Sequence, residues 1–197
     1  VDHFDCGKAL EACERHSSYA LVLGGAGHAD CINSTGMVRT MEETLVDLAA
    51  GEGPGLVYMK RKCAIQLAVL ERVLALAKGR IDILQIGEDL GTQSGPLISL
   101  ELYRRMIKPI HQQFVDLGKA HGLKVMIHSC GSSSWAYDDF IEMGIDVVDT
   151  LQPEAADMAP AYLKKRFGGR LSLHGCISTA GPVERGTLAE LEADIRE

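Results

Sequence analysis

A histidine and a cysteine stand two positions apart where an apolar run of the sequence ends, in His128-Ser129-Cys130-Gly131. Because side chains alternate along a strand, His128 and Cys130 can project to the same side. Zinc accepts imidazole nitrogen and thiolate sulfur, and Gly131 lets the chain turn and leaves room above the pair. The pattern indicates two of the three protein ligands of a catalytic metal with an open position. The alternative is a strand-end histidine bonded to a neighbouring strand beside an inert, buried cysteine.

Polar residues follow two further apolar runs. Glu88 and Asp89 are adjacent carboxylates between glycines, so they point in different directions and we expect only one to face a pocket. There it would bind metal, hold a substrate ammonium or act as a general base, and helix capping or a surface loop is the alternative. Another run ends in His174-Gly175-Cys176. Cys176 or His174 would approach the histidine–cysteine pair there, with Cys176 as a metal ligand, unless Cys176 is only packed near a tight turn.

The other polar residues near strand ends are expected to contact substrate or to have structural roles. Those predicted to contact substrate are Gln93, Asp149, Gln152 and His174. An alternative metal cluster is formed by His28, Asp30 and Cys31, but their spacing fits no familiar site. His111 falls inside an expected helix, where a surface position or an interaction with the helix dipole is the simpler expectation.

Short apolar runs alternate with segments of helical periodicity, which indicates right-handed strand–helix–strand units and an α/β fold. Strands are expected at 19–24, 81–86, 124–128, 146–151 and 170–174. Few polar residues interrupt three of these runs, as is typical of strands covered on both faces. Helices are expected at 56–78, 100–121, 135–143, 160–167 and 188–196. Pro109 should kink or divide the second of them.

Three features favour a closed (β/α)8 barrel over an open, doubly wound sheet. No G-x-G-x-x-G stands between a strand and a helix. Gly24-Gly25-Ala26-Gly27 is followed by a polar, broken segment, and polar residues end several different strands, as in barrel active sites. About 250 residues are typical of such a barrel, and only about five strands are expected here. We therefore predict a partial barrel, a single domain over residues 1–197 that is truncated at both ends.

The composition excludes several classes of function. A net charge of −7 argues against a nucleic-acid or anionic-membrane partner. No apolar stretch approaches the roughly 20 residues that a spanning helix needs. The 6 cysteines are widely spaced, without the dense framework of a small secreted domain. We therefore expect a cytoplasmic protein that acts on a small molecule.

Together, the motifs from about residue 81 to the end resemble the uroporphyrinogen decarboxylase superfamily, especially its decarboxylase-like branch of zinc- and corrinoid-dependent methyltransferases. In order, they are Glu88-Asp89-Leu90-Gly91-Thr92-Gln93, Gly95-Pro96-Leu97-Ile98-Ser99, Tyr103-Arg104, Ile107-Lys108-Pro109, His128-Ser129-Cys130-Gly131, Gly144-Ile145-Asp146-Val147, Leu151-Gln152-Pro153-Glu154, Leu163-Lys164-Lys165-Arg166-Phe167-Gly168 and Gly186-Thr187.

The resemblance implies a TIM barrel with the site in its mouth. It also implies zinc bound through H-x-C and a later cysteine, which makes a thiolate substrate nucleophilic toward a methyl group carried by a corrinoid protein. His128 and Cys130 match the first two ligands. The usual third ligand would lie beyond Glu197, and Cys176 would be a substitute for it.

Three functions therefore remain open. The first is zinc-dependent methyl transfer between a corrinoid and a thiol-type acceptor. The second is cofactor-free decarboxylation of uroporphyrinogen or a related acid, with Asp89 or Glu88 placing a protonated ring. It is disfavoured by the segment after the corresponding strand. There, those decarboxylases have a sequence like Phe-Asp-Ser-Trp-Ala-Gly, whereas this chain has Ile86-Gly87-Glu88-Asp89-Leu90-Gly91. The third is a non-catalytic corrinoid- or tetrapyrrole-binding module. Because a partial barrel has unpaired edges, we expect this chain alone to be a homo-oligomer, or to cover those edges otherwise, and to be inactive.

Overall fold

A computed structural model describes residues 3–178 and 181–196 of the chain. In this part, five parallel strands form one sheet in the order β1-β2-β3-β4-β5. Their bounds are β1 Val22–Gly24, β2 Ile83–Gly87, β3 Lys124–His128, β4 Val147–Leu151 and β5 Ser172–Gly175. The predicted α/β class and the chain positions of the five strands are confirmed, and the arrangement fits part of a (β/α) barrel.

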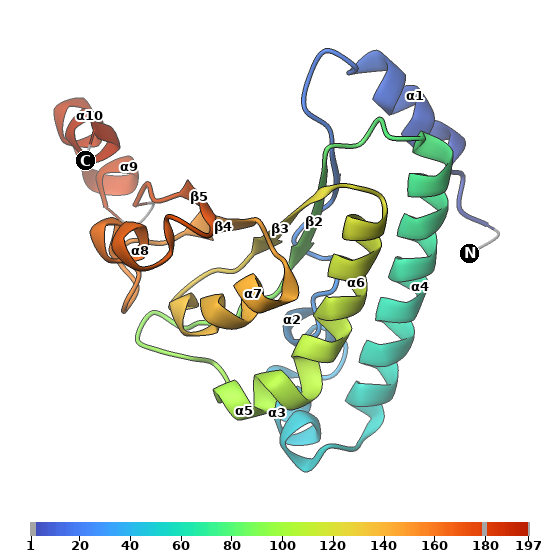
Figure 1. Cartoon of the computed structure of the whole chain (residues 1–197). Coiled ribbons are helices and arrows are strands. Elements are labelled where there is room, and N and C mark those ends of the chain that lie inside the picture. The colour runs from blue at the N-terminus through green and yellow to red at the C-terminus, as the bar shows by residue number, and fades with distance from the viewer. Residues whose placement is uncertain (1–2, 179–180, 197) are drawn as a thin grey trace.

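Helices follow the strands and pack against one another along the sheet. Figure 1 shows α6 next to β2 and β3 and α4 beside α6, with α8, α9 and α10 at the far end of the molecule beyond β5. The helices are α1 Gly7–Arg15, α2 Ile32–Gly36, α3 Met41–Ala50, α4 Pro54–Ala77, α5 Leu100–Leu102, α6 Lys108–Ala120, α7 Tyr137–Met143, α8 Pro160–Phe167, α9 Pro182–Arg185 and α10 Leu188–Arg196, with a 3-10 turn at Ser134–Ala136.

The two faces of the sheet are buried to different extents. Leu84, Ile86 and Val125 alternate with less buried residues, and all three are fully inaccessible to solvent. A methyl group added at Gly118 of α6 would meet the side chains of Leu84 and Val125, so this face packs against α6. The opposite face carries Gln85, Met126 and His128, which are half-buried. The face that packs against α6 is therefore the more deeply buried one, and the less covered face carries the polar side chains.

The helix expected over 100–121 is divided, as Pro109 predicts. Ser99 caps α5 by accepting a hydrogen bond from the Leu102 N–H at 3.1 Å. A π-helical turn then runs from Tyr103 to Ile107, and α6 begins at Lys108 with proline in its first turn. Proline has no N–H to donate, so the regular helical bonding is interrupted just before it.

One buried carboxylate holds α7 against this divided helix. Asp139, whose side chain is 1 % exposed, accepts hydrogen bonds from Lys108 Nζ at 2.6 Å and from Arg104 Nε at 3.1 Å. Burial alone would raise the pKa of Asp139, but these two cations outweigh it and hold the pKa below its ordinary value.

We predict that Asp139→Asn lowers the free energy of unfolding by about 1–3 kcal/mol at pH 7, because it leaves buried donors without their charged partner. The folded-state pKa is depressed, so the contribution is complete above the unfolded pKa and is lost as pH falls through the folded one. Urea unfolding of both proteins at neutral and acidic pH checks this. A difference that stays constant with pH would contradict it. Glu142→Gln is the matched control. The Glu142 side chain also pairs with Lys108 but is 73 % exposed, so its loss should change the free energy of unfolding little.

Candidate functional site

The loops that follow β2 and β3 touch each other at the carboxyl end of the sheet. A Cβ atom at Gly91 would overlap the backbone of Ser132, and one at Gly131, whose φ is +69°, would overlap the backbone of Gly91. Hydrogen bonds join the same loops, from Ser132 N–H to the Thr92 carbonyl at 2.8 Å and from Leu90 N–H to Ser129 Oγ at 3.2 Å. Only glycine permits such an approach, so these two positions fix how the polar residues of the two loops meet.

Three ligand atoms of different chemistry come together where these loops touch. His128 Nε2 lies 3.4 Å from Cys130 Sγ and 3.7 Å from Asp89 Oδ1, and the three donor atoms all lie within 4.8 Å of one another. Asp89 Oδ1 also accepts a hydrogen bond from the Cys130 N–H at 2.9 Å, while Asn33 Nδ2 donates to Asp89 Oδ2 at 3.0 Å. The predicted pairing of His128 with Cys130 is thus present, and Asp89 provides the third donor.

The ring of His128 is held from its other nitrogen. His128 Nδ1 lies 2.9 Å from Thr150 Oγ1 and 3.2 Å from Asp149 Oδ2. Consecutive strand residues normally point to opposite faces, but β4 has a register shift between Val148 and Leu151, and Thr150 has a φ of +60°. This irregularity brings both side chains to one ring, so Nε2 is directed at the other two donors.

Asp149 also connects His128 to a second histidine. Its Oδ1 lies 2.5 Å from His174 Nδ1, and Gln85 Nε2 donates to its Oδ2 at 3.1 Å. Burial would raise the pKa of Asp149, but hydrogen bonds from His174, His128 and Thr150 together lower it below its ordinary value. The carboxylate therefore stays ionised, which suits a group that orients an imidazole bound to a metal.

The thiol of Cys130 is not activated by its surroundings. Burial, followed by the nearby charge of Asp89, raises its pKa to about 11. Nucleophilic and redox-active cysteines have lowered pKa values and lie near positive charge. Cys130 therefore suits a metal ligand better than a free nucleophile, because a bound cation would supply the missing positive charge.

A cavity of about 600 Å³ opens beside this cluster. Asp89 and His128 form part of its wall, and the start of α2 and the exposed Met37 form another part. Such a volume is in the range of small-molecule sites.

The other residues predicted to act here have different placements. Gln152 Oε1 accepts a hydrogen bond from the Gly131 N–H at 2.6 Å, so it supports the loop after β3. Gln93 is exposed, and its carbonyl accepts a hydrogen bond from Ala156. Cys176 is not among the donors that lie within 4.8 Å of one another, and it lines a separate cavity against α8. The role of Cys176 as a metal ligand stays a prediction, and Asp89 is the donor that lies nearest the histidine–cysteine pair in this group.

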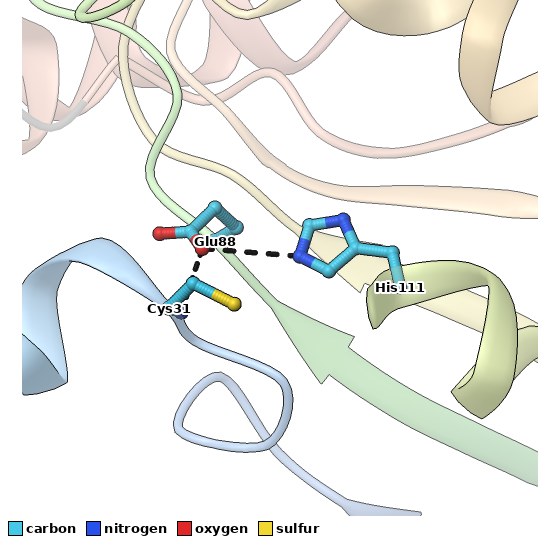
Figure 2. Close-up of side chains that lie close together, drawn as sticks. All are labelled: Cys31, Glu88 and His111. Atoms are coloured by element: carbon cyan, nitrogen blue, oxygen red, sulfur yellow. Dashed lines mark hydrogen bonds and ion pairs between the residues drawn. The ribbon is translucent and has the colours of Figure 1, made fainter. Parts of the chain in front are cut away.

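The two adjacent carboxylates point to opposite sides of the strand end. Asp89 joins the cluster at the cavity, whereas Glu88 is 1 % exposed and lies beneath the start of α2, close to Cys31 and His111 (Figure 2). A surface position for His111 was wrong, because the residue is fully buried. A signal existed in the sequence, since His111 precedes Phe114 by three positions on the apolar stripe of its helix.

Comparison with known proteins was informative for the fold only. A solved structure of a methyltransferase from Methanosarcina mazei superimposes with a TM-score of 0.59 and 16% identity, over 95% of this chain and 53% of that one. The chain shares its fold with about half of a methyltransferase. No family model and no curated protein sequence matches the chain. Among the described residues, no helix is long and apolar enough to cross a membrane.

We predict that Gly91→Ala separates the two loops and destabilises the fold by about 1–3 kcal/mol, because the new methyl group overlaps the backbone of Ser132. The same variant should bind zinc more weakly. Urea unfolding and zinc titration measure the two effects. Gly95→Ala is the control in the same loop, since nothing lies within 4 Å of its Cβ position. Equal stability and equal zinc affinity of the two variants would show that the close approach of Gly91 to Ser132 is unimportant.

Asp149→Asn should weaken zinc binding by about 10–100-fold, because the carboxylate that orients His128 is lost while the three donors remain. A competitive chelator titration measures the affinity. Asp138→Asn removes a half-exposed carboxylate that pairs with Arg166 and Arg170, so it serves as the control. Unchanged zinc affinity in Asp149→Asn would exclude the orienting role.

Proposed function

We propose that this chain is part of a zinc-dependent methyltransferase of the uroporphyrinogen decarboxylase superfamily, built on a partial barrel of that type. It would move a methyl group between a corrinoid and a thiol-type acceptor. The observation that carries the proposal is the group of Asp89, His128 and Cys130 donors beside a cavity at the carboxyl ends of the strands. A fold shared with a methyltransferase supports it.

The donor set fits zinc. Nitrogen, sulfur and carboxylate oxygen are the ligands that this ion takes in proteins, and three protein ligands leave a position for a substrate. Asp149 and Thr150 supply the hydrogen bonds that usually hold a metal-bound imidazole in place. When bound, zinc would act as a Lewis acid that lowers the pKa of a coordinating thiol, which makes the thiolate available near neutral pH.

The residues around the donors would position the acceptor and receive its proton. The side chain of His174 is 68 % exposed, and its Nδ1 is bonded to Asp149. This leaves Nε2 free to take up the proton that the acceptor thiol loses, and the Asp149 carboxylate would stabilise the resulting imidazolium. Asp89 would have two functions, as a ligand and as the group that fixes the Cys130 backbone.

Several expectations stay predictions. They include a corrinoid protein as the methyl carrier, a cytoplasmic location, a homo-oligomer, and a single domain that is a truncated barrel. β1 and β5 are the edges of the sheet in the described part of the chain. Parallel strands with open edges favour association, which supports the expectation of an oligomer.

Zinc content and methyl transfer test the proposal. We expect Cys130→Ser to lose about one equivalent of zinc per chain, whereas Cys176→Ser, whose sulfur lies outside the cluster, should lose none. In the longest form of the protein that contains this chain, methylcobalamin should lose its methyl group to a small alkyl thiol only when zinc is bound. Zinc content unaffected by Cys130→Ser would contradict the metal role. Release of CO2 from uroporphyrinogen without methyl transfer would point to decarboxylation instead.

A further inference from the structure

A second group of three ligand atoms lies on the other side of the β2 end, and it is completely buried. Cys31, at the start of α2, Glu88, at the end of β2, and His111, in α6, are exposed by 0%, 1% and 0%. Their donor atoms lie within 4.8 Å of one another. In Figure 2, the His111 ring points at the Glu88 carboxylate. The Cys31 thiol donates a hydrogen bond to the Ala29 carbonyl at 3.3 Å. The three ligand residues come from three elements that are far apart in the sequence.

One atom of this cluster lacks the partner that burial demands. Among the described residues, His111 Nε2 makes no hydrogen bond, and Glu88 Oε2 lies 3.8 Å from it, which is beyond hydrogen-bond reach. The ring is nevertheless fixed, because Tyr103 Oη lies 3.3 Å from its Nδ1. In the tautomer whose Nδ1–H donates to Tyr103 Oη, Nε2 carries the free lone pair that a metal would need. Buried nitrogen atoms of this kind are rarely left unpaired in folded proteins.

The carboxylate in the cluster is only partly neutralised by its neighbours. Glu88 accepts hydrogen bonds from the backbone N–H groups of Cys31 at 2.6 Å and Ile32 at 3.1 Å. Burial nevertheless raises its pKa to about 7. The nearby Lys62 ammonium donates to the Asp30 carbonyl and to Ser34 Oγ. A hydrogen bond with Asp30 and the charge of Lys62 oppose this rise, and a divalent cation would add further positive charge beside the carboxylate.

We propose that Cys31, Glu88 and His111 bind a structural zinc ion that fastens α2 and α6 to the end of β2. One thiolate, one carboxylate and one imidazole are ligand types that zinc accepts. The Tyr103 hydroxyl at Nδ1 supplies the outer hydrogen bond that orients a metal-bound histidine. This site shares no ligand with the one at Asp89, His128 and Cys130, and it does not depend on the function proposed above.

Cobalt binding in a Cys130→Ser chain tests the proposal, because that substitution removes the sulfur of the first cluster. The 197-residue chain is refolded with Co²⁺, and free metal is removed. We expect thiolate-to-cobalt charge-transfer absorption in Cys130→Ser and its loss in Cys130→Ser/Cys31→Ser. The band should persist in Cys130→Ser/Cys13→Ser, since Cys13 is a buried cysteine outside the cluster.

A second variant keeps the test decisive if Cys31→Ser does not fold. In the Cys130→Ser background, His111→Gln should weaken cobalt binding by about tenfold or more and reduce the metal-dependent rise in Tm. A folded Cys130→Ser chain that shows no charge-transfer band would overturn the proposal, and so would a band that survives removal of the Cys31 sulfur. Either result would leave the zinc site at Cys130 and the proposed methyl transfer untouched.

Discussion

The arrangement of the site depends on the contact between the loops that follow β2 and β3. The Asp89 carboxylate accepts the Cys130 N–H at 2.9 Å, and the backbones of Gly91 and Gly131 lie closer than any side chain would allow. This contact places an oxygen donor from one loop beside the nitrogen and sulfur donors of the next. Without it, His128 and Cys130 would lie at the strand end without the Asp89 oxygen beside them.

The parallel sheet sets the remaining geometry. β2, β3 and β4 are in register at Gly87, His128 and Asp149, so their carboxyl ends meet at one edge. The helix-covered face is tightly packed, and the opposite face carries the half-buried polar groups. The irregularity at Thr150 turns one more side chain toward His128. Irregular backbone next to a candidate ligand is a frequent feature of functional sites.

Regular elements were predictable from the sequence, and contacts between them were not. β3, α8 and α10 have the predicted bounds, because apolar periodicity and neighbouring Gly and Pro residues mark them clearly. α3 was missed although Thr40 caps its start, with the Glu43 N–H donating to Thr40 Oγ1 at 3.2 Å. β1 begins at Val22, three residues later than expected. Spacing also predicted that His128 and Cys130 share a side, which the structure bears out at 3.4 Å.

The third donor and the buried cluster depend on tertiary structure. Asp89 joins His128 only because two loops touch, and Glu88 meets His111 only because α6 packs across β2. No local pattern encodes these distances. From the sequence, Cys176 was a possible substitute ligand because it also ends a strand, and in the structure it lines another cavity, against α8.

We propose that Asp89, His128 and Cys130 hold one zinc ion. The most direct measurement is an anomalous difference map at the zinc absorption edge from a crystal of the chain grown with zinc. We expect a peak about 2.0–2.3 Å from the Asp89 oxygen, His128 Nε2 and Cys130 Sγ. Ordered side chains at these three positions with no anomalous peak between them would contradict it.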